Sequence, residues 1–243
     1  MQNTILTIKH FIIFIQLFLA PLLAYGQSLN YPGIFGDDWK KAEQFVADNE
    51  QWIRPVLEKY KVDYYEAIAV VFPELVRYSA LRDMMEITLL KALYINIGKD
   101  YANFSIGHFQ MKPSFAELII DEGRSLTGRR KPLINDSTKY EDIRSFRAAI
   151  VSSLEDTHYQ LDYLVIFFKI TTNKFDLKHF DSSNRIRFLS TAYNYGFFHS
   201  EEEIKEMSDK KFYSTKLVSK ELWSYADISL YWYNNVLAKI KEK

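Results

Sequence analysis

The sequence predicts a mostly α-helical protein, and three observations lead to this expectation. Apolar residues recur at three- and four-residue spacing along most of the 243 residues. Stretches that alternate apolar and polar residues, as strands do, are few. Capping residues, glycines and prolines divide the periodic stretches into segments of ordinary helix length. We therefore expect helices around a single core, with a short extended or β-like segment near residues 99–112.

The N-terminal residues 1–26 have the pattern of an export signal peptide. A basic pair precedes the apolar run FIIFIQLFLAPLLA, and AYG then supplies the small-any-small order of a cleavage site. An uncleaved membrane anchor is the less favoured alternative, because the run is shorter than the roughly 20 residues that span a bilayer. We expect an exported, periplasmic or otherwise extracytoplasmic protein that begins at Gln27 and keeps no integral membrane anchor.

Composition limits what the remaining chain, residues 27–243, can be. Its length suits one domain, and the full sequence of 243 residues is 48% hydrophobic, enough to fill a core. Lysine and arginine total 31 and so do aspartate and glutamate, so no excess of positive charge indicates nucleic acid as a partner. The chain has no cysteine, which excludes disulfides and thiol nucleophiles.

The first half of the chain is expected to form three helices. A helix over residues 37–60 opens with two aspartates and is expected to break once near Asn49. Asp63 can cap the next helix, in which residues 64–78 carry one apolar stripe. A further apolar-rich helix over residues 81–97 ends at a glycine.

The second half is expected to be helical as well. Pro113 can begin a helix because its fixed backbone angle and missing N–H suit the first turn. The longest helix is expected over residues 138–168, starting with a capping box. A short helix then ends at Gly196, a second capping box lies at residues 200–203, and a terminal helix covers residues 228–240.

Most kinds of catalytic site find no support in the sequence. The five histidines show neither helical pairing nor the spacing of zinc ligands, so we expect no metal and no cofactor. No phosphate-binding glycine loop is present. A Ser-His-Asp arrangement stays open, although no nucleophile elbow supports it. Carboxylate chemistry is what remains.

Glu74 is the carboxylate whose position favours such chemistry. At 100° per residue it lies about 80° from the centre of the apolar stripe of its helix, at the edge of the buried face. Partial burial raises the pKa of a carboxyl, as a general acid near neutral pH requires. Pro73 directly before it removes a helical hydrogen bond and favours a kink. The alternative is a solvated glutamate at a helix bend.

Two further stretches gain meaning beside Glu74. The first is SIGHFQMKP at residues 105–113, and the second is TAYNYG at residues 191–196. Taken in this order, the three elements resemble the lysozyme-like domain of soluble lytic transglycosylases and goose-type lysozymes over roughly residues 63–196. The matching positions after Glu74 are Gly107, Phe109, Gln110, Met111, Pro113, Ala192, Tyr193, Asn194 and Gly196.

The resemblance implies a lysozyme-like helical domain that acts on the glycan strands of peptidoglycan, the cell-wall polymer. Glu74 would be the general acid and base that cleaves the β-1,4 bond between N-acetylmuramic acid and N-acetylglucosamine. The product of a lytic transglycosylase is a 1,6-anhydro sugar end, made without water or a second carboxylate. Substrate binding is then expected from Ser105, Gln110, Met111, Tyr193 and Asn194.

Three alternatives stay open at this point. A muramidase would hydrolyse the same bond, with Asp100 as the best-placed second carboxylate, although that residue also suits a solvated loop. A catalytically inactive peptidoglycan-binding or envelope assembly protein is favoured by Leu75, because the family usually has a serine after its glutamate. Alternatively, the motif matches are accidental. Ser105 could equally satisfy its own turn, Tyr193 could simply pack in the core, and His108 is expected to be exposed.

Overall fold

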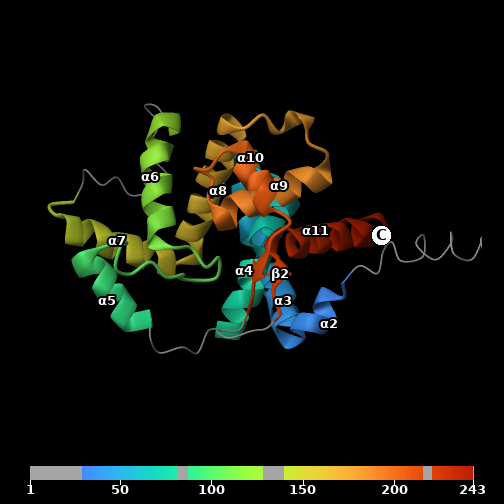
Figure 1. Cartoon of the computed structure of the whole chain (residues 1–243), viewed down its shortest axis with the longest axis horizontal. Coiled ribbons are helices and arrows are strands. Elements are labelled where there is room, and N and C mark those ends of the chain that lie inside the picture. Colours follow the sequence, from blue (N-terminus) through green and yellow to red (C-terminus); the bar gives the residue numbers. More distant parts are fainter. Residues whose placement is uncertain (1–28, 82–86, 128–139, 216–220, 243) are drawn as a thin grey trace, which may run out of the picture. The chain divides into compact units, whose positions relative to one another are not determined.

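A computed structural model of the chain describes residues 29–81, 87–127, 140–215 and 221–242 (Figure 1). The predicted signal peptide, residues 1–26, lies outside these residues. The chain divides into two compact units, residues 1–34 and 35–243. No helix in the described ranges has both the length and the apolar character to cross a membrane.

The expectation of a mostly helical protein is confirmed. The helices and strands, in chain order, are α2 (Tyr31–Phe35), α3 (Asp37–Lys59), α4 (Tyr64–Leu81), α5 (Ile87–Ile97), α6 (Pro113–Thr127), α7 (Ile143–Glu155), α8 (Thr157–Lys174), the short 3-10 helix η2 (Leu177–His179), α9 (Ser182–Tyr195), α10 (Glu201–Met207), β1 (Lys211–Tyr213), β2 (Trp223–Ser224) and α11 (Tyr225–Lys241).

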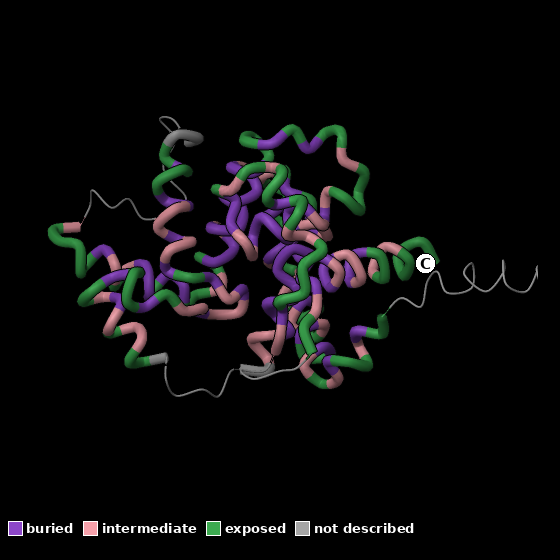
Figure 2. The backbone as a smooth tube through the Cα atoms, in the orientation of Figure 1, coloured by how far each residue is buried: buried purple, intermediate pink, exposed green. Residues whose placement is uncertain are grey.

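Helix α4 lies at the centre of the core. It packs against α3, α9 and α11, and residues 67–72 are fully buried (Figure 2). A helix that is apolar all round must be covered on every side, which explains why three others surround it. Asp63 begins α4 as expected, since its carboxylate accepts a hydrogen bond from the backbone N–H of Glu66 at 2.9 Å.

A second set of helices packs beside this centre. Helix α6 contacts α7 and α8, α5 contacts α7, and α8 also contacts α9. Helix α6 begins at Pro113, and α9 ends before Gly196 with a φ of 134°, both as the sequence predicts. The capping box of Ser200 and Glu203 at the start of α10 is also confirmed.

The predicted long helix over residues 138–168 is wrong. The chain forms two helices, α7 and α8, which are separated at Asp156 by an extended backbone with φ −102° and ψ 121°. The Asp156 carboxylate accepts a hydrogen bond from the backbone N–H of His158, so this residue ends one helix and caps the next. Asp142 caps α7, whereas Thr138 of the predicted capping box lies outside the described residues.

The predicted break near Asn49 is also wrong, because α3 continues through it. The Asn49 side chain donates to the carbonyl of Phe45 at 2.7 Å and accepts from the indole of Trp52 at 2.8 Å. Both partners lie on the same helix, so this polar side chain is satisfied without leaving it.

The described residues contain two β features. Within the expected extended segment, Ile106 and Met111 form an isolated antiparallel bridge with N–O distances of 2.9 and 3.1 Å. The turn between them uses left-handed backbone at Gly107 and Gln110. The two-stranded antiparallel sheet of β1 and β2 lies elsewhere, between α10 and α11, and was not predicted.

Candidate functional site

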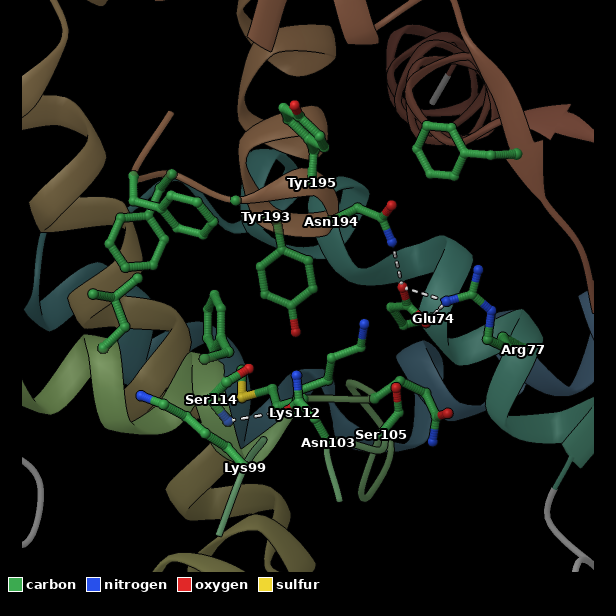
Figure 3. Close-up of a pocket in the computed structure, with 18 residues that line it drawn as sticks. Glu74, Arg77, Lys99, Asn103, Ser105, Lys112, Ser114, Tyr193, Asn194 and Tyr195 are labelled. Atoms are coloured by element: carbon green, nitrogen blue, oxygen red, sulfur yellow. Dashed lines mark hydrogen bonds and ion pairs between the residues drawn. The ribbon is translucent and has the colours of Figure 1, made fainter. Parts of the chain in front are cut away.

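The candidate site is centred on the carboxylate of Glu74, in the middle of α4. Its side chain is only 3% exposed. Arg77, one turn further along α4, donates to both carboxylate oxygens at 2.8 and 2.9 Å. Asn194 of α9 donates from its amide to Oε1 at 3.1 Å (Figure 3). The carboxylate is therefore held in one orientation by two elements far apart in the sequence.

Opposing effects set the charge state of Glu74. Burial raises the pKa of its carboxyl above the ordinary value, because removal from water disfavours the charged form. The positive charges of Arg77 and Lys112 and the hydrogen bond from Asn194 act against this and favour the carboxylate. We take the effect of burial as the larger one, so Glu74 keeps a proton to a higher pH than an exposed glutamate does.

Arg77 is itself held by the region around β1. Its guanidinium lies over the ring of Tyr213, 4.5 Å from the ring centre, and its Nε donates to the carbonyl of Ser214. The hydroxyl of Tyr213 in turn donates to the carbonyl of Pro73. Pro73 lies inside α4 without ending it. The Pro73 carbonyl thus joins α4 to β1, while the kink expected at Pro73 stays a prediction.

Gln160 of α8 fixes the loop that carries the SIGHFQM motif. This fully buried amide donates to the carbonyls of Ile106 and Leu154 at 2.7 and 2.8 Å and accepts from the N–H of Phe109 at 2.9 Å. The backbone of Gly107 passes so close that an added Cβ would lie 2.1 Å from the Gln160 Nε2. The glycine of the motif is required by this contact.

The other motif residues are arranged around this loop. The hydroxyl of Tyr193 donates to the carbonyl of Phe109 at 2.7 Å, and burial raises the pKa of this phenol. That hydroxyl therefore supports the loop, while the ring lines the site. Gln110 turns its amide back to the carbonyl of Gly107 at 2.8 Å. The amide of Asn194 donates to Glu74 and orients its carboxylate.

These residues surround a cavity of about 620 Å³. All six residues singled out from the sequence line it, namely Glu74, Ser105, Gln110, Met111, Tyr193 and Asn194. Its volume is within the range of small-molecule pockets. Its lining includes the aromatic residues Phe115, Tyr195, Phe197, Phe198 and Phe212 and the cationic residues Arg77, Lys99 and Lys112. Three segments distant in sequence thus meet at one place.

The structure also places Asp100 and His108, the two residues whose surroundings the sequence left open or predicted as exposed. Asp100 is exposed in its loop and is not among the residues that line the cavity. His108 was expected to be exposed, which is wrong. Its ring is half-buried, stacked on Phe45 at 4.5 Å and against Tyr78 at 4.4 Å, and a ring nitrogen lies 2.8 Å from the Thr157 hydroxyl. Burial lowers the pKa of this histidine.

The comparisons with known proteins add no family. No protein-family model, curated protein or solved structure matches the chain. Within the described residues, no group of histidine and carboxylate side chains is arranged to hold a metal ion. The site must therefore be understood from its own residues.

Sequence reasoning missed several residues of the site, among them Arg77, Lys112, Gln160 and Phe212. Arg77 follows Glu74 by three positions on one helix, a spacing that places side chains together, so a signal for it existed. Lys112 lies within the quoted motif but was given no role. Gln160 and Phe212 gave no signal, because their contacts join segments that are far apart in the chain.

Proposed function

We propose that the protein is a peptidoglycan lytic transglycosylase with Glu74 as its general acid and base. The observation that carries this proposal is the position of Glu74, a buried carboxyl that reaches a ligand-sized cavity together with Gln110, Tyr193 and Asn194. The resemblance of these elements to lysozyme-like domains adds the class of substrate. The predicted export signal agrees with it, because peptidoglycan lies outside the cytoplasmic membrane.

The chemistry divides into two proton transfers. Protonated Glu74 gives its proton to the oxygen of the β-1,4 bond, which breaks as positive charge develops on the ring of N-acetylmuramic acid. The carboxylate formed then removes the proton from the 6-hydroxyl of the same sugar. That oxygen attacks the anomeric carbon and closes the 1,6-anhydro ring, and Glu74 recovers its proton.

Arg77 and Asn194 have matching roles in this cycle. Asn194 keeps Oε1 in a fixed orientation in both protonation states. Arg77 favours the negative charge that appears on Glu74 after the first transfer. Together, Arg77 and Asn194 lower the free energy of the Glu74 carboxylate, while burial still raises the pKa of its carboxyl.

The number of carboxylates supports the transglycosylase over the muramidase. Hydrolysis with inversion needs a second carboxylate about 6.5–9.5 Å from the acid, to activate water. Among the described residues that line the cavity, Glu74 is the one carboxylate. Asp100, the candidate for this second carboxylate, is exposed and does not line the cavity. Transfer to the sugar's own hydroxyl needs no such partner.

A second candidate function rests on the contact between Arg77 and Glu74. An arginine that donates to both oxygens of a buried carboxylate is also the arrangement of a structural ion pair. In that case the cavity binds glycan strands without cleaving them, as an inactive peptidoglycan-binding or envelope assembly protein would.

Incubation with purified sacculi separates these functions. We expect the wild-type protein to release soluble muropeptides with anhydro ends and Glu74→Gln to release none. Glu66→Gln is a matched control, because Glu66 lies on the same helix, is ion-paired to Arg185, and does not line the cavity. It should retain activity. Release by Glu74→Gln at the wild-type rate would remove this residue from the mechanism. Co-sedimentation with sacculi without any release would favour the binding protein.

A further inference from the structure

One cationic side chain that lines the cavity has no role in the proposed mechanism. Three cationic side chains, Arg77, Lys99 and Lys112, line the cavity against the single carboxylate of Glu74. Arg77 is paired with that carboxylate at 2.8 Å. Lys99 is paired with Glu117 at 2.8 Å. Within the described part of the chain, Lys112 makes no ion pair.

The backbone at Lys112 is anchored on both sides, although the residue itself is exposed. Met111 before it is buried and bridged to Ile106, and Pro113 after it is buried as the first residue of α6. Figure 3 shows the Lys112 side chain extending into the cavity between Tyr193 and Glu74. Its charge also acts on the Glu74 carboxyl. A positive charge is thus held close to the proposed reaction centre.

A ligand carboxylate is the natural partner for this ammonium. Charge-assisted hydrogen bonds are among the stronger polar contacts, and a partly enclosed cavity weakens them less than open water does. Peptidoglycan strands carry such groups close to the bond that breaks. The lactyl carboxyl is attached to the muramic acid ring, either free or extended by a peptide with carboxylates of its own. Neutral polymers of N-acetylglucosamine have none.

We propose that Lys112 binds a carboxylate of the muramic acid substituent and thereby selects anionic peptidoglycan strands over neutral glycans. This inference rests on the proposed function for the identity of the sugar, but the subsite can be tested without turnover. Lys112 is the specificity-determining residue, and Glu74 remains the residue that reacts.

The first test measures binding of single sugars, which have no bond to cleave. Ligands are N-acetylmuramic acid, its alanine conjugate and its methyl amide, titrated by NMR. They offer a lactyl carboxylate, a peptide carboxylate and no carboxylate. We expect at least one acid to bind about tenfold or more tightly than the methyl amide, which corresponds to one charge-assisted hydrogen bond. The acid that binds more tightly identifies the source of the carboxylate.

Variants assign this preference to its residue. Lys112→Met keeps the length of the side chain and should reduce the preference to about onefold, whereas Lys112→Arg should retain most of it. Lys210→Met is the matched control, because Lys210 is exposed and does not line the cavity. Equal binding of the acids and the methyl amide to the wild type would overturn the proposal. So would an unchanged preference in Lys112→Met.

The second test uses sacculi and separates this proposal from the function on which it rests. We expect Lys112→Met to raise KM about tenfold on native strands. The KM of Lys112→Met should equal that of the wild type on strands whose carboxyls have been converted to amides. An acid preference that depends on Lys112, without any cleavage of sacculi, would support the subsite and refute the transglycosylase. Cleavage with an unchanged KM in Lys112→Met would do the reverse.

Discussion

Replacing Gly107 with alanine tests how the loop of residues 105–111 is held against α8. Gly107 has a φ of +70°, and a Cβ there would lie 2.1 Å from the Gln160 amide nitrogen and 2.5 Å from the Leu154 carbonyl. Gly36 is a matched control, because its φ is +55° and an added Cβ would meet nothing within 4 Å. Both substitutions place alanine at positive φ, but only the new methyl group at Gly107 would meet other atoms.

The magnitudes follow from this difference. Left-handed backbone costs alanine about 1–2 kcal/mol at Gly107. The cost at Gly36 is about 1–3 kcal/mol, because its ψ of −120° lies outside the left-handed helical region. At Gly107 the new methyl group also displaces the Gln160 amide, with the loss of its three buried hydrogen bonds. At about 1 kcal/mol each, these bring the total to about 4–5 kcal/mol. For a chain of this size, the melting temperature should fall by about 10–15 °C, against about 3–9 °C for Gly36→Ala.

With circular dichroism as the readout, chemical denaturation measures the loss of unfolding free energy and thermal melting measures the fall in melting temperature. A double variant, Gly107→Ala with Gln160→Met, adds a second check. Because both changes remove the same hydrogen bonds, their combined loss of unfolding free energy should be well below the sum of the two. Equal losses for the two glycine variants, or strict additivity in the double variant, would refute the role given to Gln160.

Three further results are expected. The general acid must be protonated, so activity should fall as pH rises through the pKa of Glu74. Arg77→Gln removes a positive charge that lowers this pKa, so the fall in activity should move to higher pH. A pH–rate profile whose alkaline side does not move in this variant would contradict the assignment. Tyr193→Phe keeps the ring but leaves the Phe109 carbonyl without its donor, so calorimetry should show a loss of about 1–2 kcal/mol and kinetics a lower kcat. Burial lowers the pKa of His108, so the unfolded chain binds the proton more readily and unfolding free energy should decrease as pH falls below about 6.5. In His108→Gln this acid-side decrease should be smaller, and an identical pH dependence would count against the burial of the ring.

The sequence predicted the features that depend on neighbouring residues. Asp63, Pro113, Gly196 and the capping box at Ser200 each act through contacts within a turn, so their residue types suffice to predict them. The stripe of α4 was visible for the same reason. These local rules are what placed the motif residues on their elements.

The features that depend on distant contacts could not be predicted in this way. The apolar pattern continues across Asp156, so the break between α7 and α8 could not be read from it. The structure shows the break in the extended backbone of Asp156 and in the hydrogen bond that its carboxylate accepts from the His158 N–H. Strand β1 is three residues long, and Tyr213 within it is oriented by contacts with α4. The sequence also placed Glu74 at the edge of the buried face, whereas the packing around α4 leaves it 3% exposed.

Digestion of sacculi in water enriched in ¹⁸O tests the central claim most directly, because the origin of the oxygen at the new sugar end identifies the group that attacked. We predict soluble muropeptides with 1,6-anhydro ends that contain no ¹⁸O, and no such products from Glu74→Gln. Reducing ends that contain ¹⁸O would show that water attacks. Anhydro products from Glu74→Gln would contradict the role of this carboxyl altogether.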